Sequence, residues 1–264
     1  MKTDNDGRNS ARAIDILAHR GGCAGEYPDN TIAAFREGLA RGADVVEMDV
    51  HLTSDGEVVV AHDPYIVGAR GEEVVFAETS FVELSTYVGD HNVPSDERPA
   101  PTLSAVMEAF PTVRSNIDLK SEDPELGTAV VELVRRHGAT ARTTVASCHT
   151  SALERFRSIA PEVATSAHPD EVKQFLLGTV TRRKPTSPAR VLQVPIRHGI
   201  LPIATRAFVT YAHRYGYFVH VWTVNDPRVA VRLAKIGVDG IVTDDVGRIK
   251  DALDTFDRSR RSSI

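Results

Sequence analysis

Cysteine and tryptophan are scarce in this chain of 264 residues, which contains two cysteines and one tryptophan. Cys23 and Cys148 are too few for a disulfide framework or a thiolate zinc site, so a reducing compartment is the default expectation. Long apolar runs are also missing: no segment approaches the length of a membrane span. The first residues, MKTDNDGRNSARA, lack the apolar core of a signal peptide. The sequence therefore predicts a cytoplasmic protein without stable membrane insertion.

A basic surface is missing as well. The formal net charge is -5 at pH 7, whereas a general nucleic-acid binder would show a basic face, so no nucleic acid is expected as a partner. The apolar and charged fractions, 42% and 25%, are ordinary for a soluble protein. The length suits one large domain, and α/β barrels commonly have this size. The oligomeric state has no signature in the sequence.

Short apolar runs alternate with amphipathic segments along most of the chain. This alternation predicts a parallel sheet with helices outside it. Eight repeats in this length favour closure into a TIM barrel over an open doubly wound sheet. The G-x-G-x-x-G fingerprint of dinucleotide-binding open sheets is also absent. The predicted strands cover residues 14–18, 45–50, 113–119, 143–146, 163–166, 191–194, 217–224 and 238–242, and each is followed by a predicted helix.

The segment from Pro64 to Pro101 interrupts this alternation. It carries several glycines, prolines and charged residues, and one helix-like piece from Thr79 to Tyr87. We expect it to form a small insertion over the barrel mouth, after the second strand. The predicted organisation is a disordered N-terminus at 1–12, one TIM-barrel domain at 13–257 that includes the inserted subdomain 64–101, and a flexible basic tail at 258–264.

The stretch 43–63, ADVVEMDVHLTSDGEVVVAHD, combines acids and a histidine with strand-forming residues. Glu47 and Asp49 are two apart on a predicted strand, so their carboxylates project from the same face. Asp55-Gly56 is a strong hairpin signal, and a two-residue turn there would pair His62 with Asp49. Two converging carboxylates beside a histidine indicate a hard divalent cation with an acid/base group next to it. The alternative is an edge hairpin with its charged face in water.

Polar side chains recur at the ends of other predicted strands. In a barrel these carboxyl ends meet at one mouth, where catalytic groups gather. The first strand ends at His19-Arg20, and the third carries Asp118 and Lys120 on one face. Their shared position predicts a catalytic site more strongly than any single residue does. Other strand-end residues are Ser147, His149, Trp222, Asn225, Asp244 and Asp245.

The residue types at this mouth predict metal-assisted phosphoryl chemistry. Glu47, Asp49 and Asp118 would together form an oxygen site for one divalent cation, Mg²⁺ or Ca²⁺, without which three clustered anions are costly to hold. Arg20 and Lys120 are of the types that bind phosphate.

Two histidines are favoured for proton transfer. His19 and His62 both end strands next to the predicted metal ligands, and imidazole titrates near neutral pH. His51 and His149 could line the same mouth, although turn or cap roles fit them better. Trp222 is of a type more often found in the core, but at a strand end it could form an apolar wall.

With these residues in hand, the sequence resembles the glycerophosphodiester phosphodiesterase family. The likeness covers nearly the whole predicted barrel, and several separated motifs in the right order are more specific than any one of them. The insertion at 64–101 falls where this family carries its small extra domain. The motifs are His19-Arg20-Gly21, PDNT (28–31), GADVVEMDV (42–50), LTSDG (52–56), His62-Asp63, NIDLK (116–120), VWTVN (221–225) and GVDGIVTDD (237–245).

The resemblance implies hydrolysis of a glycerophosphodiester, a small-molecule substrate, to sn-glycerol 3-phosphate and an alcohol. The nucleophile, water or the substrate's own 2-hydroxyl, stays open. The roles it implies are His19 and His62 as acid/base pair, Glu47, Asp49 and Asp118 as metal ligands, Arg20 and Lys120 as phosphate contacts, and Trp222 beside the glycerol.

The chain also departs from the family pattern. Asp29 replaces the usual glutamate of the PENT motif, and Asp118 replaces a glutamate at the third metal position. The insertion begins with the run Pro64-Tyr65-Ile66-Val67 in place of an Asp-Arg-Thr-Thr-like start. The head group of the substrate is therefore the least transferable property.

Three alternatives remain beside this interpretation. A phospholipase D-like enzyme that cleaves lysophospholipids would use an apolar entrance, which Phe76, Phe81 and Tyr87 of the insertion could supply. A phosphate-binding protein without catalysis is disfavoured because both His19 and His62 are present. A metal hydrolase of the amidohydrolase kind is disfavoured because the first strand lacks its His-x-His.

Overall fold

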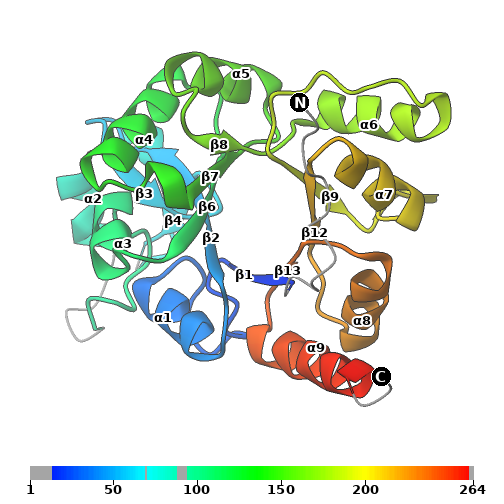
Figure 1. Ribbon diagram of the computed structural model, residues 1–264. Coiled ribbons are helices and arrows are strands. Elements are labelled where there is room, and N and C mark those ends of the chain that lie inside the picture. The colour runs from blue at the N-terminus through cyan, green and yellow to red at the C-terminus, as the bar shows by residue number, and fades with distance from the viewer. Residues whose placement is uncertain (1–13, 69, 88–93, 262–264) are drawn as a thin grey trace.

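The computed structural model describes residues 14–68, 70–87 and 94–261. Eight parallel strands form a barrel with helices on the outside (Figure 1), in the order β8-β7-β6-β2-β1-β13-β12-β9. A parallel bridge between Ser166 and Val191 connects the two ends of this order. The TIM-barrel prediction is confirmed. The strands are β1 (Asp15–His19), β2 (Val45–Leu52), β6 (Arg114–Leu119), β7 (Thr143–Ala146), β8 (Ala164–Thr165), β9 (Val191–Pro195), β12 (Phe218–Trp222) and β13 (Gly240–Thr243).

Local sequence explains where several of the outer helices begin. The hydroxyls of Thr31, Thr102 and Thr205 cap helices by accepting hydrogen bonds from first-turn amides. Asp123 and Asp226 cap helices whose first residue is proline. The helices are α1 (Ile32–Ala40), α3 (Leu103–Ala109), α4 (Pro124–Arg136), α5 (Thr150–Ile159), α6 (Pro169–Thr181), α7 (Arg206–Arg214), α8 (Pro227–Ile236) and α9 (Val246–Arg261).

The described part of the C-terminal tail is helical. α9 continues to Arg261, so it includes residues 258–261 of the tail, whose flexibility stays a prediction. After Gly247 this segment contains neither glycine nor proline, so nothing in its sequence stops the helix. The predicted disordered N-terminus at 1–12 lies outside the described residues.

A close contact between α1 and the first loop positions the end of β1. A Cβ atom on Gly38 of α1 would lie only 2.0 Å from the carbonyl oxygen of Gly21. Only glycine permits this approach, and the loop it touches directly follows His19 and Arg20. The helix therefore holds in place the loop that carries two candidate site residues.

The insertion folds as a small unit beside the barrel. It begins with a hairpin that was not predicted, formed by β4 (Tyr65–Val67) and β5 (Glu73–Val75). The short helix η1 (Phe76–Glu78) and the helix α2 (Phe81–Tyr87) follow. α2 matches the helical piece predicted from Thr79 to Tyr87. Asp55 Oδ1, in the turn between β2 and β3 (Val58–Val60), accepts a hydrogen bond of 3.0 Å from the Phe81 amide. The insertion is thus tied to the strand that carries the site's carboxylates. Its apolar core consists of Val59, Ile66, Val74, Phe76, Leu84 and Ala100.

The pairing of β2 with β3 (Val58–Val60) is shifted by one residue from the prediction. The loop has three residues rather than two: Thr53 N donates to Glu57 O at 2.9 Å, and Glu57 N donates to Thr53 Oγ1 at 2.9 Å. Gly56, the last loop residue, has φ +85°, as a three-residue loop with a bulge requires.

This shift changes what lies opposite Asp49. Ala61, not His62, pairs there, and its amide donates to the Asp49 carbonyl oxygen at 3.0 Å. Because side chains alternate along a strand, a slip of one residue moves a side chain to the other face. The predicted pairing of His62 with Asp49 is therefore wrong, although His62 still lies at the barrel mouth.

Among the residues that the structure describes, no helix combines the length and the apolar character that crossing a membrane requires.

Candidate active site

Strand pairing brings the three candidate carboxylates to one end of the barrel. β2 lies between β1 and β6, and its Glu47 pairs with His19 while its Asp49 pairs with Asp118. Glu47 is 6% exposed and Asp49 1%. The sequence-predicted ligands therefore come from adjacent strands and reach a largely buried floor.

Two cations partly neutralise these acids. Lys120 Nζ lies 2.8 Å from Asp49 Oδ1 and 2.8 Å from Asp118 Oδ2. The Arg20 amide donates to Glu47 Oε2 at 3.1 Å. Arg20 Nε lies 3.1 Å from Asp49 Oδ2, an ion pair without the alignment of a hydrogen bond. Both predicted phosphate-binding side chains thus lie against the carboxylates.

The pKa values show where charge remains unbalanced. Burial, followed by the negative charges of Asp49 and Asp118, raises the pKa of Glu47 to about 8. Burial also raises the pKa of Asp118, despite Lys120. For Asp49 the effect of burial is outweighed by Lys120, Asn30 and Arg20, so its pKa is lowered. Glu47 and Asp118 are therefore the carboxylates whose charge the surroundings compensate incompletely.

These three carboxylates have the donor type that Mg²⁺ and Ca²⁺ require. Within residues 14–68, 70–87 and 94–261, however, no three His, Cys, Asp or Glu side chains are arranged as a metal site. The ammonium group of Lys120 takes up the position between Asp49 and Asp118. The raised pKa of Glu47 indicates a surplus of negative charge that a bound cation would relieve. The oxygen donors of these residues therefore fit a hard divalent cation by their chemistry. In the structure, Asp49 and Asp118 are arranged around the ammonium group of Lys120.

His19 is held by an acid from the last strand's end. Its Nδ1 lies 2.5 Å from Asp244 Oδ1. Asn225 fixes that acid by donating from Nδ2 to Asp244 Oδ2 at 2.5 Å and accepting from the Asp244 amide at 2.9 Å. Burial lowers the pKa of His19, but the hydrogen bond to Asp244 and the charges of Glu47 and Asp244 raise it above its ordinary value. The sequence marked Asp244 and Asn225 as strand-end residues but not as supports of His19.

His62 is held from two sides. Its Nδ1 lies 2.9 Å from Asp63 Oδ1, and its carbonyl oxygen is 3.0 Å from His51 Nε2. Because a carbonyl oxygen only accepts, His51 Nε2 is the donor. His51 is buried, which lowers its pKa, and its ring packs against Phe76 of the insertion at 5.7 Å between centroids. His51 thus links the insertion to His62, a role the sequence did not reveal.

Asn30 is a second residue whose role was missed. It directly precedes Thr31, the residue that caps α1. Asn30 is buried at φ +60° and donates from Nδ2 to Asp49 Oδ2 at 3.1 Å, while its amide donates to the Arg20 carbonyl at 2.8 Å. The PDNT stretch therefore orients Asp49. In the sequence, the PDNT motif was the feature that could have pointed to this role of Asn30.

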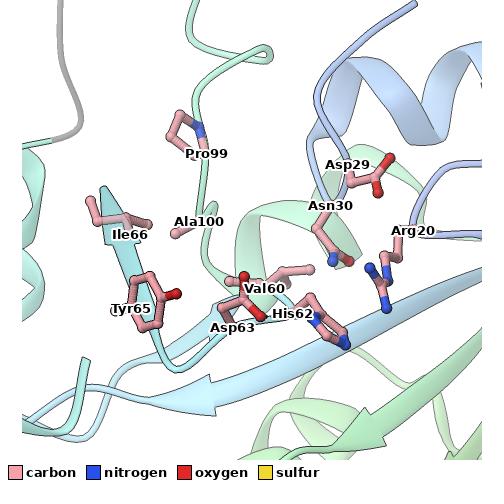
Figure 2. A pocket seen from close by; sticks show the side chains of 11 residues that line it. Arg20, Asp29, Asn30, Val60, His62, Asp63, Tyr65, Ile66, Pro99 and Ala100 are labelled. Carbon is pink, nitrogen blue, oxygen red and sulfur yellow. Dashed lines mark hydrogen bonds and ion pairs between the residues drawn. The ribbon is translucent and has the colours of Figure 1, made fainter. Parts of the chain in front are cut away.

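A cavity of about 230 Å³ opens beside these groups, between the barrel rim and the insertion. Figure 2 shows Arg20, Asn30 and His62 on the barrel side, facing Tyr65 and Pro99 of the insertion. The insertion therefore does border the mouth, as predicted.

Trp222 lies elsewhere on the rim. It is the last residue of β12, paired with Pro195 of β9, and is 42% exposed. It is not among the residues that line the cavity. The mouth thus has two sides, one bordered by the insertion and one bordered by this tryptophan.

The insertion's aromatic residues differ in burial. Phe76 is 1% exposed, so it does not line an apolar entrance, whereas Phe81 and Tyr87 are half-buried against the insertion's core. An entrance supplied by Phe81 and Tyr87 stays a prediction.

A closed parallel barrel with acids, histidines and cations gathered at the carboxyl ends of its strands defines the class of protein, a TIM barrel with an enzyme-like site at its mouth. The family model of the glycerophosphoryl diester phosphodiesterase family matches residues 19–248. The chain belongs to this family, which confirms the resemblance drawn from its motifs.

Individual relatives agree with this assignment. The chain is 31% identical to Probable glycerophosphodiester phosphodiesterase 2 of Mycobacterium tuberculosis, over 90% of this chain and 89% of that protein. It is 27% identical to a human lysophospholipase D, over 91% and 86%. An Oleispira antarctica phosphodiesterase, solved in complex with the product sn-glycerol-3-phosphate, has the same fold, with a TM-score of 0.70 at 24% identity over 91% of this chain and 96% of that one.

Proposed function

We propose that this protein hydrolyses glycerophosphodiesters to sn-glycerol 3-phosphate and an alcohol, with His19 and His62 as the acid/base pair. The observation that carries the proposal is the pairing of each imidazole Nδ1 with a carboxylate, Asp244 or Asp63, at one mouth. Family membership and the product complex of the Oleispira antarctica relative support it.

Arg20 and Lys120 bind the phosphate in this proposal. Burial lowers the pKa of Lys120, but Asp118 and Asp49 raise it well above its ordinary range, so the ammonium stays charged. Both cations also neutralise the buried carboxylates, which keeps the anionic substrate from meeting a negative floor. Trp222 flanks the glycerol on the opposite side of the mouth from the insertion.

The two histidines transfer protons. Asp244 and Asp63 occupy their Nδ1 atoms, which leaves Nε2 of each ring as the atom that exchanges a proton with the substrate. One imidazole removes a proton from the nucleophile, either water or the substrate's 2-hydroxyl, and the other protonates the departing alkoxide.

Glu47, Asp49 and Asp118 are the residues that would hold one divalent cation, Mg²⁺ or Ca²⁺. When bound, that ion polarises phosphate oxygens and stabilises the charge that develops on them. Asn30 orients Asp49, and the Arg20 amide orients Glu47, so the chain positions two of the three carboxylates independently of the ion.

The test is release of glycerol 3-phosphate from glycerophosphocholine and glycerophosphoethanolamine, with EDTA and with added Mg²⁺ or Ca²⁺. We expect metal-dependent release, and a His62→Ala variant that loses about two to four orders of magnitude in kcat. His213→Ala is the matched control, because this histidine bonds Asp239, which precedes β13 at the opposite end from the proposed site. Asp118→Asn is expected to weaken metal binding in a calorimetric titration. Release that EDTA leaves unchanged would remove the metal from the proposal, and normal turnover by His62→Ala would remove His62.

A lysophospholipase D activity is the second candidate. It is favoured by exposed apolar residues on the tryptophan side of the mouth. β9 ends beside Trp222, and the hairpin that follows it, β10 (Arg197–His198) and β11 (Leu201–Pro202), exposes Ile200 by 92% and Leu201 by 54%. The human relative carries this activity in its name. Comparing lysophosphatidylcholine with glycerophosphocholine separates the two candidates, and Ile200→Ser is expected to slow only the lipid substrate.

A further inference from the structure

We propose that the cavity between the barrel rim and the insertion receives the leaving alcohol and selects a cationic one, a quaternary or primary ammonium alcohol, through Tyr65, Asp29 and Asp63. The inference rests on the proposed function and deepens it, since it assigns the head group that the motifs leave open.

The position of the cavity indicates that the alcohol half of the substrate lies in it. Arg20 and His62 line it and also belong to the proposed catalytic mouth, so the cavity is continuous with the reacting centre. His19 and Trp222 are not among its lining residues. A group seated in the cavity would therefore lie beside His62, which makes His62 the imidazole that protonates the departing alkoxide and His19 the one that takes the nucleophile's proton. The glycerol phosphate half is left to the side of the mouth that Trp222 borders.

Charged side chains line part of the cavity. Asp29 and Asp63 both line the cavity and both are exposed to it rather than buried in the core. The lining cation, Arg20, lies 3.1 Å from the Asp49 carboxylate and is assigned to the phosphate. Once an anionic phosphate sits on Arg20, Asp29 remains as negative charge in the cavity, while Asp63 is already paired with the His62 imidazole. Such a lining favours a positively charged occupant.

The insertion side of the cavity adds an aromatic ring and apolar surface. Figure 2 shows the Tyr65 ring and Ile66 on the insertion side, with Asp63 and Val60 between them and the barrel residues. An aromatic face beside carboxylates is the combination that recognises ammonium groups in proteins. A volume of about 230 Å³ suits a small head group and is below the range typical of drug-sized ligands.

The same lining disfavours a neutral polyol. Such a head group must replace several hydrogen bonds to water, and each hydroxyl left without a partner costs free energy. Much of the wall consists of apolar side chains, which cannot form hydrogen bonds with these hydroxyls. They pack well against methyl or methylene groups instead. These apolar residues are Val60, Ala61, Ile66, Pro99 and Ala100.

Two segments that are distant in the fold's connectivity supply these residues. Asp29 lies in the PDNT stretch and Tyr65 lies at the start of the insertion. The two segments meet across one cavity, so we assign them a shared role in binding one head group.

The experiment measures kcat/KM of the full-length protein for four diesters of the same glycerol phosphate. Glycerophosphocholine and glycerophosphoethanolamine carry cationic alcohols; glycerophosphoglycerol and glycerophosphoinositol carry neutral ones. We expect the cationic pair to be preferred by about tenfold or more. Tyr65→Leu is expected to reduce that preference by about three- to tenfold, whereas Tyr65→Phe, which keeps the aromatic face, retains most of it. Asp29→Asn should also reduce it.

Val67→Ala is the matched control. Val67 lies on the same strand as Tyr65, is 65% exposed and does not line the cavity, so it should leave the preference unchanged. Equal kcat/KM for cationic and neutral diesters would overturn the inference while leaving the proposed function intact. A Tyr65→Leu variant that slows all four substrates equally would also overturn it. Absence of glycerol 3-phosphate from every diester would instead refute the proposed function.

Discussion

His19 and His62 owe their orientation to different parts of the molecule. Asp244 and Asn225, from the ends of the last two barrel strands, hold His19. His51 and Asp63, from the hairpin next to the insertion, hold His62. At the residue scale, the proposed acid/base pair is therefore positioned by four supporting side chains, and each imidazole can be perturbed separately.

Asp244→Asn should lower kcat by about ten- to a hundredfold and leave KM nearly unchanged. Asparagine is similar in shape, but it removes the charge that favours the imidazolium. It also has one acceptor oxygen where Asp244 uses two, one for His19 Nδ1 and one for Asn225 Nδ2. Steady-state kinetics with glycerophosphocholine measure this split. Asp245→Asn, one residue along the chain, is the control. An equal loss in the control, or a loss confined to KM, would contradict a positioning role for Asp244.

At the element scale, the short strand β8 depends on a buried ion pair. Arg157 of α5 donates to Glu171 of α6 from both terminal nitrogens, at 3.1 and 2.9 Å, and also to the Ser166 carbonyl oxygen at 2.8 Å and the Thr165 hydroxyl at 2.9 Å. β8 itself contains only two residues and lies where the barrel closes. One arginine thus connects this strand to both neighbouring helices.

Glu171→Gln should lower the free energy of unfolding by about 1.5 to 3 kcal/mol, because it removes a charge-assisted pair from a buried arginine. Burial raises the pKa of Glu171, but the hydrogen bonds from Arg157, Ser187 and the His168 amide lower it overall. A lowered folded-state pKa means that the contribution is present above about pH 4.5 and is lost as pH falls through the folded value. Thermal melts of both proteins should therefore converge in acid.

Asp170→Asn provides the comparison for that prediction. Asp170 is the neighbouring residue, and its ion pair with Lys173 is exposed, with side chains 60% and 74% accessible. Such pairs contribute little, so this variant should melt within about 0.5 kcal/mol of the parent. A Glu171→Gln variant as stable as Asp170→Asn at neutral pH would show that the buried pair is not what secures β8.

At the scale of the whole molecule, the proposed site joins elements far apart in the chain. Its residues come from β1, β2, β6 and β12, and the insertion closes one side. A ligand that contacts all of these should stabilise the barrel as a unit.

sn-Glycerol 3-phosphate at about a hundredfold excess over its Kd should stabilise the folded state by about 2.7 kcal/mol. For a chain of this size that corresponds to a rise in Tm of roughly 5 to 10 °C. Differential scanning fluorimetry measures it, with glycerol as the ligand control and Arg20→Ala as the protein control. An equal rise with glycerol, or an undiminished one in Arg20→Ala, would show that the phosphate is not bound by Arg20.

The sequence by itself determined the order and type of the barrel elements, because apolar periodicity, caps and turn residues act over a few neighbouring positions. It also brought His19, Glu47, Asp49, Asp118 and Lys120 to one end of the barrel, since the carboxyl ends of parallel strands meet there. Local sequence patterns, together with the rule that the carboxyl ends of parallel strands meet at one end of a barrel, are enough to determine these features.

Only the tertiary structure decided which side chains contact one another across the mouth. Thr53 closes a three-residue loop and shifts the register that a two-residue turn would have produced. The contacts of His19 with Asp244, and of His62 with His51, join residues whose side-chain directions no local pattern specifies. The cavity that joins the insertion to the barrel has the same origin, because its walls come from segments separated in sequence and packed together only in the folded chain.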